Sequence, residues 1–218
     1  MTRQRADLYR TTRDRIVQLV SDLDDASWRI PVAACPRWTV RDVAAHLAAV
    51  AEEVVCGRLT GPPTDEQAAA QIARFDGRTV DDIMAAWSAA AAELDRTAES
   101  GGAASLVIDV VSHEHDLRGA LGRPGARDSD AVRYTSDRLL TGLRTPVSLR
   151  VSVGDAEYSA GRGGEPEIEL RTTRFDALRW RMGRRSRAQL AAMDWTGDPG
   201  PVLDHLCVFG PAAVDVVE

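Results

Sequence analysis

Residues 38–50, WTVRDVAAHLAAV, and residues 108–119, IDVVSHEHDLRG, decide the expected fold, because apolar side chains recur in both at the three- and four-residue spacing of a helix. Asp109 and His113 are four residues apart, so they share one face of the second helix, and His46 can approach from the first. Two imidazoles and a carboxylate can bind a divalent metal ion and leave one coordination position open, as catalytic sites do. A simple hydrogen bond between Asp109 and His113 is the structural alternative.

Histidine is scarce in this chain. Its four copies are His46, His113, His115 and His205. Two of them lie in strongly apolar helical stretches, where an imidazole without a partner is costly to bury, and this favours the metal site. We expect Glu114 and His115 to face away from Asp109, since each residue turns a helix by about 100°. His205 is expected to be exposed or hydrogen-bonded.

The composition restricts the class of protein. A chain of 218 residues with 44% hydrophobic and 28% charged residues can bury a sizeable core. The net charge of -6 and the pI of about 5.3 argue against nucleic acid as the main partner. The N-terminal residues mix charges throughout, and no apolar run reaches membrane-spanning length. We therefore expect a cytoplasmic protein with no membrane partner.

The three cysteines, Cys35, Cys56 and Cys207, are widely spaced and form no CxxC pair. This usage indicates neither a disulfide framework nor a cysteine zinc site. Cys35 precedes a proline in an expected loop, where a nucleophilic thiol is conceivable, but free cysteine is commonly a small buried residue. We therefore place Cys35 outside the metal site. We expect Trp38 to fill the core at the start of its helix.

The first part of the chain has the pattern of a four-helix bundle. Helices are expected at about 3–24, 39–58, 79–99 and 103–122. Thr39 with Asp42, and Thr79 with Asp82, resemble capping arrangements for the second and third of these helices. The glycines and the proline of GRPGAR, at 122–127, forbid continuation of the fourth helix.

The second part has the pattern of a small α+β domain. After a short helix at about 128–143, the segments PVSLRVSVG, AEYSAGRG and EPEIELRT alternate with period two and predict three short antiparallel strands. RFDALRWRMGRRS returns to helical spacing, MDWTGD predicts an extended segment, and PGPVLDHLCVF predicts a closing helix. We place the domain boundary at 145, which gives a bundle at 1–145 and an α+β domain at 146–218.

Two blocks of the sequence also resemble a known family. CPRWTVRDVAAHL resembles the CPGWTVRDVxAHL block of mycothiol-dependent maleylpyruvate isomerase-like proteins, which belong to the DinB-like metal-binding superfamily. The family's ExxxHxxDL pattern is matched by Asp109, His113, Asp116 and Leu117. The segments SLRVSVGDAEYSAGRG, LRWRMGRRSRAQL and WTGDP resemble the sterol-carrier-like α+β domain that often follows the bundle.

The resemblance implies a mainly α protein with a smaller α+β part, namely a DinB-like antiparallel four-helix bundle followed by a sterol-carrier-like domain. It also implies a divalent metal, usually zinc, held by His46, His113 and Asp109, where Asp109 replaces the longer glutamate of the family. Asp116 can accept a hydrogen bond from the ring nitrogen of a ligating histidine that does not bind the metal. The implied activity is that of a transferase or isomerase that uses mycothiol as thiol cosubstrate and acts on a small electrophile. Metal coordination would supply the reactive thiolate.

Several alternatives stay open at this point. A metal-dependent hydrolase or amidase could use a bound hydroxide in place of the thiol. A protein of the same fold could also bind a small ligand without catalysis. The arginines of 179–187, RWRMGRRSR, either bind an anionic substrate or form a solvated helix face. The exposed faces of a bundle can support a homodimer, and no general base is assigned.

Overall fold

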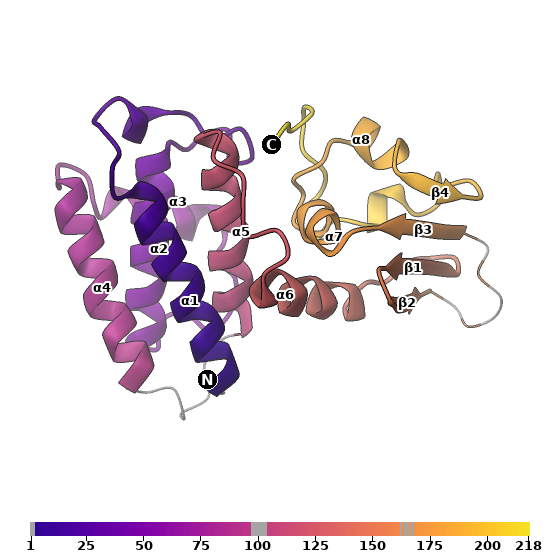
Figure 1. The fold of residues 1–218 in the computed structure, drawn as a ribbon, viewed down its shortest axis with the longest axis horizontal. Helices are drawn as coiled ribbons and strands as arrows, with labels where there is room; N and C mark the ends of the chain where they lie inside the picture. The colour runs from indigo at the N-terminus through magenta and orange to yellow at the C-terminus, as the bar shows by residue number, and fades with distance from the viewer. Residues whose placement is uncertain (1–2, 97–103, 162, 164–165, 167) are drawn as a thin grey trace. The chain divides into compact units, whose positions relative to one another are not determined.

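The computed structural model describes residues 3–96, 104–161, 163, 166 and 168–218 of the chain. The chain divides into two compact units (Figure 1). The first unit comprises Met1–Pro124 together with Glu218, and the second comprises Gly125–Val217. The boundary that we predicted at 145 lies beyond α6 (Asp130–Thr141), whereas the structure places α6 in the second unit because it packs against α7 (Arg174–Arg181).

The first unit is a helical bundle, as predicted. It contains α1 (Arg3–Val20), α2 (Val40–Val55), α4 (Val80–Arg96) and α5 (Ala104–Ala120). Helix α2 packs against both α4 and α5, while α1 packs against α5. Parts of two predicted helices, residues 97–99 and residue 103, lie outside the described residues. The structure adds α3 (Asp65–Ala73), which we did not predict, on the side of α2.

Capping interactions fix where the helices of the bundle begin, as predicted. The Thr39 side chain accepts a hydrogen bond from the Asp42 N–H, and the Asp42 carboxylate accepts one of 2.9 Å from the Thr39 N–H. Thr79 and Asp82 make the same reciprocal pair before α4, at 3.0 and 3.2 Å. Each pair satisfies backbone donors that a helix start would otherwise leave unpaired. The register of α2 is thereby set, and His46 faces the bundle interior.

The core of the bundle is apolar and closely filled. Val43, Ile83 and Val110 are fully buried and come from three different helices. Trp87 of α4 is also fully buried, and its indole N–H donates a 2.8 Å hydrogen bond to the Tyr9 hydroxyl of α1. Burial raises the pKa of Tyr9 well above its usual value, so this hydroxyl stays neutral. The bundle therefore offers a rigid frame for polar groups placed on α2 and α5.

The second unit pairs a four-stranded sheet with short helices. Its strands are β1 (Leu149–Val153), β2 (Ala156–Ala160), β3 (Ile168–Thr172) and β4 (Asp194–Thr196), in the order β2-β1-β3-β4. β1 and β2 form the predicted antiparallel hairpin, but β3 pairs with β1 in parallel, so our prediction of three antiparallel strands was wrong for β3. The alternating pattern sets which face of a strand is buried and carries no information about its neighbour.

Two other predictions for the second unit were corrected. The closing helix of 199–209 is reduced to a single 3-10 turn, η2 (Leu203–His205), after a segment that contains two prolines. The arginines of 179–187 do not all form a solvated face, because Arg179 and Arg181 are buried. Arg181 donates hydrogen bonds to the carbonyl oxygens of Leu139 and Leu206. Arg187 alone among these three is exposed, and it pairs with Asp204 at 2.7 Å.

Helix α8 (Arg187–Ala191) completes the second unit. None of the helices in the described part of the chain has the length and apolar character that a membrane crossing requires.

Candidate metal centre

Helices α2 and α5 bring the three predicted ligands together. Nε2 of His46 lies 3.5 Å from the Asp109 carboxylate, and Nε2 of His113 lies 3.6 Å from the same oxygen, Oδ1. One donor atom from each of the three side chains falls within 4.8 Å of the other two. Both imidazoles are buried, while Asp109 keeps 21% of its side chain exposed. Asp109 is thus the one partly exposed residue of the three, although its Oδ2 is buried.

These separations fit the ligand spacing of a metal ion better than direct hydrogen bonds. Zinc binds imidazole nitrogen and carboxylate oxygen at about 2.0–2.2 Å, so two such ligands at a tetrahedral angle lie about 3.4 Å apart. The observed 3.5 and 3.6 Å are near that value and exceed the length of a usual N–H···O bond, about 2.7–3.2 Å. Nδ1 of His46 is buried and makes no hydrogen bond within the described residues. Hydrogen bonding therefore accounts poorly for the burial of His46.

Trp38 forms a wall of the cluster, where we expected it to fill the core. Its ring centroid lies 4.8 Å from that of His46 and 5.7 Å from that of His113, and the two imidazoles meet edge to face at 5.1 Å. Trp38 is only partly buried. The indole therefore shields one side of both imidazoles from water while it remains reachable from outside.

Asp116 contacts the other ring nitrogen of His113. The distance from its Oδ2 to Nδ1 of His113 is 3.0 Å, and the side chain of Asp116 is fully buried. This is where we predicted a supporting carboxylate to lie. A carboxylate beside the second nitrogen of a ligating histidine fixes which nitrogen carries the proton and how the ring is oriented.

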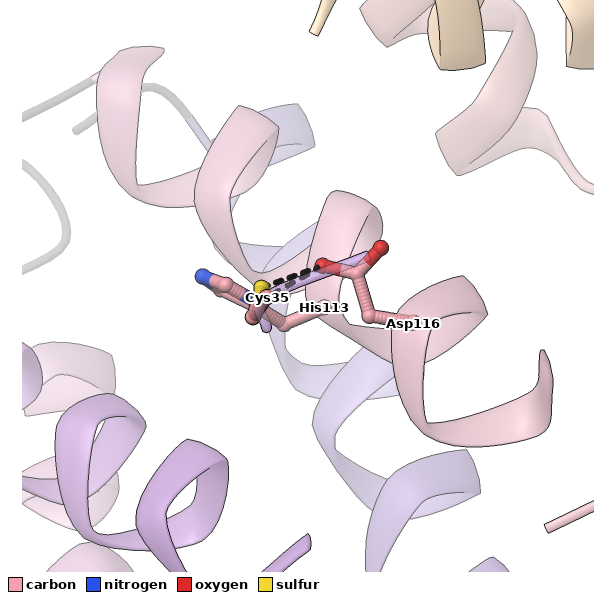
Figure 2. Close-up of side chains that lie close together, drawn as sticks. All are labelled: Cys35, His113 and Asp116. Carbon is pink, nitrogen blue, oxygen red and sulfur yellow. Dashed lines mark hydrogen bonds and ion pairs between the residues drawn. The ribbon is translucent and has the colours of Figure 1, made fainter. Parts of the chain in front are cut away.

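Cys35, which we placed outside the site, contacts the same carboxylate. Its thiol donates a hydrogen bond of 3.5 Å to Oδ2 of Asp116, and Figure 2 shows the sulfur beside the imidazole of His113. Cys35 and Asp116 are 81 residues apart in sequence, so no local pattern links them. The only sequence signal is that Cys35 stands three residues before Trp38 and four before the cap of α2.

The remaining polar residues near Asp109 lie as expected or make other pairs. Glu114 is fully buried, and it accepts hydrogen bonds from Arg15 at 2.6 and 2.8 Å and from Arg118 at 3.0 and 3.1 Å. It therefore faces away from the cluster. His115 is buried and belongs to neither of the two possible metal-ligand groups of the described residues, and His205 is exposed in the second unit.

A groove opens beside the cluster in the first unit. It has a volume of about 440 Å³, and Cys35, Pro36 and Trp38 form one side while Ala68 and Ile72 of α3 form the other. Arg37 and Asp65 also line it and form an exposed ion pair at 3.1 Å. A small molecule that enters this groove would contact two side chains, Cys35 and Trp38, that border the buried histidines.

Comparison with known proteins agrees with this architecture. Residues 9–112 match the family model of the mycothiol maleylpyruvate isomerase N-terminal domain. Among solved structures, the mycothiol-dependent maleylpyruvate isomerase is similar at 18% identity and a TM-score of 0.59. A histidine-to-alanine mutant of that isomerase is similar at 16% identity and a TM-score of 0.61. Each alignment covers 83% of this chain and 88% of the other. No curated protein matches the chain in sequence.

The fold is that of a helical-bundle protein with a smaller α+β unit, and the bundle contains a buried cluster of histidines and a carboxylate. Residues 9–112 match the N-terminal domain of mycothiol maleylpyruvate isomerase, in agreement with the resemblance of the two sequence blocks, and the chain shares the fold of the solved mycothiol-dependent maleylpyruvate isomerase structures. The family model ends at residue 112, so it covers His46 and Asp109 but stops one residue before His113.

Proposed function

We propose that the protein is a metal-dependent enzyme that uses a low-molecular-weight thiol, mycothiol, to isomerise or transfer a group on a small electrophilic substrate. The observation that carries this proposal is the spacing of His46, Asp109 and His113, whose donor atoms lie 3.5 and 3.6 Å apart. A divalent ion, zinc in the first instance, would lower the pKa of a coordinated thiol so that a thiolate forms at neutral pH.

Three residues of the chain would bind such an ion. His46 and His113 supply neutral nitrogen ligands from two helices, and Asp109 supplies one negative charge. Asp109 is one methylene shorter than the family's glutamate. It nevertheless lies at ligand spacing from both imidazoles, because its helix α5 packs directly against α2. Three protein ligands leave room for a further ligand, which is what a catalytic site requires.

The groove is the proposed route for thiol and substrate. Trp38 and Cys35 lie on its wall, and Trp38 also contacts both histidines while Cys35 contacts Asp116, so a molecule in the groove would be separated from the cluster by these side chains alone. Asp116 keeps the His113 ring oriented by its contact with Nδ1. Trp38 keeps water from one side of the imidazoles, which strengthens electrostatic interactions there.

The test is metal content together with thiol-dependent turnover. Wild-type protein, stripped by a chelator and reloaded with zinc, should hold about one zinc per chain by elemental analysis. His46→Ala should lose it, while His205→Ala, which removes an exposed histidine of the second unit, should retain it. A screen of small electrophiles with mycothiol should then show consumption of substrate only with the zinc-loaded wild type and His205→Ala.

Two results would contradict the proposal. Wild-type protein that takes up no zinc would exclude the metal-dependent mechanism and favour ligand binding without catalysis. Zinc-loaded protein that hydrolyses substrates at the same rate with and without thiol would instead favour a hydrolase. Asp109→Glu provides a finer control, because restoring the family's longer carboxylate should preserve or tighten zinc binding if Asp109 is the ligand.

A further inference from the structure

His113 lies between two sets of donor atoms, one at each ring nitrogen. Its Nε2 faces Asp109 and His46, which form the candidate zinc site. Its Nδ1 faces Asp116 at 3.0 Å, and Asp116 in turn lies 3.5 Å from the sulfur of Cys35. Cys35, His113 and Asp116 each place a donor atom within 4.8 Å of the other two (Figure 2). The second set thus resembles the first in compactness but contains sulfur.

The spacing within this second set also suits a bound ion. Zinc-like ions bind thiolate at about 2.3 Å and carboxylate at about 2.0 Å, which puts tetrahedral sulfur and oxygen ligands about 3.5 Å apart. The distance between Sγ of Cys35 and Oδ2 of Asp116 is 3.5 Å. Asp116 and His113 are buried, and Nδ1 of His113 faces Oδ2 of Asp116 at 3.0 Å. Cys35 lines the groove, so an ion can reach the set from solvent.

We propose that Cys35, His113 and Asp116 form a second metal position that is selective for thiophilic cations and cannot be filled together with the His46 site. Thiolate is a soft ligand and prefers soft ions such as cadmium or monovalent copper over harder divalent ions. The His46 site offers nitrogen and oxygen only. The identity of the ion therefore selects the position, and this holds whether or not the protein is an enzyme.

The two positions exclude one another as long as the imidazole that they share is neutral. A neutral imidazole has one nitrogen with a free electron pair and one that carries a proton. When Nε2 binds an ion beside His46, the proton is on Nδ1 and faces Asp116. When Nδ1 binds an ion beside Cys35, the proton is on Nε2 and faces Asp109, 3.6 Å away. Each carboxylate thus serves as a ligand in one state and faces the protonated ring nitrogen in the other.

Cadmium titration tests the proposal, because a cadmium-thiolate bond gives an ultraviolet charge-transfer band. Wild-type protein should show this band with about one cadmium per chain and should release its zinc in proportion. Cys35→Ser should lose the band, whereas Cys56→Ser, which removes an exposed cysteine, should retain it. His46→Ala should also retain the band, because His46 belongs only to the other position. His113→Ala should lose it.

Three outcomes would overturn the proposal. They are absence of the band from the wild type, its persistence in Cys35→Ser, and full zinc retention while the band saturates. Helical circular dichroism of Cys35→Ser confirms that the variant is folded. Should that variant fail to fold, cadmium NMR of the wild type decides instead, since a sulfur ligand moves the resonance away from that of nitrogen and oxygen sites. The loss of zinc in His46→Ala reports on the proposed function alone, because His46 belongs only to the first position, so failure of one proposal is separable from failure of the other.

Discussion

His113 and Glu114 are neighbours on α5, yet they belong to two buried polar clusters of different kinds. The Glu114 carboxylate is paired within the protein, since Arg15 and Arg118 donate hydrogen bonds of 2.6–3.1 Å to it. Around His113, Asp109 lies at the spacing of a metal ligand on one side of the ring, and Asp116 lies at 3.0 Å on the other, next to the thiol of Cys35. Burial of a charged or polar residue is common to both clusters, so burial alone does not mark a functional site. The chemical identity of the neighbouring side chains distinguishes the two clusters.

The largest effect is expected from His113→Ala, which removes the residue shared by both donor sets. Binding of a structural zinc ion is worth about 10–16 kcal/mol over four ligands, so one ligand is worth about 3 kcal/mol, or about 100-fold in affinity. Competition with a chromogenic chelator measures this loss. Zinc affinity equal to that of the wild type would show that the His113 cluster does not bind metal and would remove the contrast with Glu114.

Glu114→Gln should cost stability and leave metal binding intact. It removes the negative charge between Arg15 and Arg118, and breaking a buried ion pair costs about 3 kcal/mol. Urea unfolding of the metal-free protein measures this loss, with Glu66→Gln, a change at an exposed residue of α3, as the control. If Glu114→Gln released zinc without lowering the unfolding free energy, the roles assigned to the two clusters would have to be exchanged.

Asp116→Asn should weaken zinc binding by about 10- to 100-fold, the usual effect of losing a carboxylate behind a ligating histidine. The amide has the same shape, so packing is kept while the charge beside Nδ1 of His113 is lost. Isothermal titration calorimetry compares it with Asp81→Asn, which changes an exposed residue of α4. An unchanged affinity would mean that Asp116 is a packing residue rather than a support for His113.

Thr79→Ala should have the smallest effect and should leave both clusters untouched. Loss of this helix cap costs about 1 kcal/mol at neutral pH. Hydrogen bonds from the Thr79 hydroxyl and backbone hold the pKa of Asp82 below its ordinary value of 3.8. A carboxyl with a lowered pKa stabilises the folded state above the pKa of the unfolded chain, and this is lost as the pH falls through the folded value.

The difference in thermal midpoint between Thr79→Ala and wild type should therefore be larger at pH 7 than below about pH 4. A difference that grows with acidity would contradict the assigned pairing of Thr79 with Asp82. Zinc affinity of Thr79→Ala at neutral pH should match that of the wild type, which makes this variant a control for the three larger effects.

Local patterns in the sequence predicted the helices that carry the candidate site. Thr39 and Asp42 fixed the start of α2, and the spacing of Asp109, His113 and Asp116 placed three polar side chains on one helix, where the structure has them. Binding of metal by these residues stays a prediction. Cys35 was missed because its contact with Asp116 spans 81 residues and arises from packing of a loop against α5.

The errors elsewhere have similar physical causes. Helix α3 has nine residues and follows two prolines, so its apolar pattern was too short to recognise. The parallel pairing of β1 with β3 depends on which edge of β1 is free after the β1–β2 hairpin has formed. An alternating sequence specifies the buried face of each strand but not the edge at which the next strand arrives.

The position of Trp38 has a practical consequence for following ion binding. Its ring centroid lies 4.8 Å from that of His46 and 5.7 Å from that of His113, whereas Trp87 lies in the core and is hydrogen-bonded to Tyr9. A cation bound by the imidazoles would place positive charge near the indole, and indoles respond electrostatically to nearby cations. Of the five tryptophans in the chain, Trp38 therefore lies at the candidate centre, and we expect ion binding to change its emission.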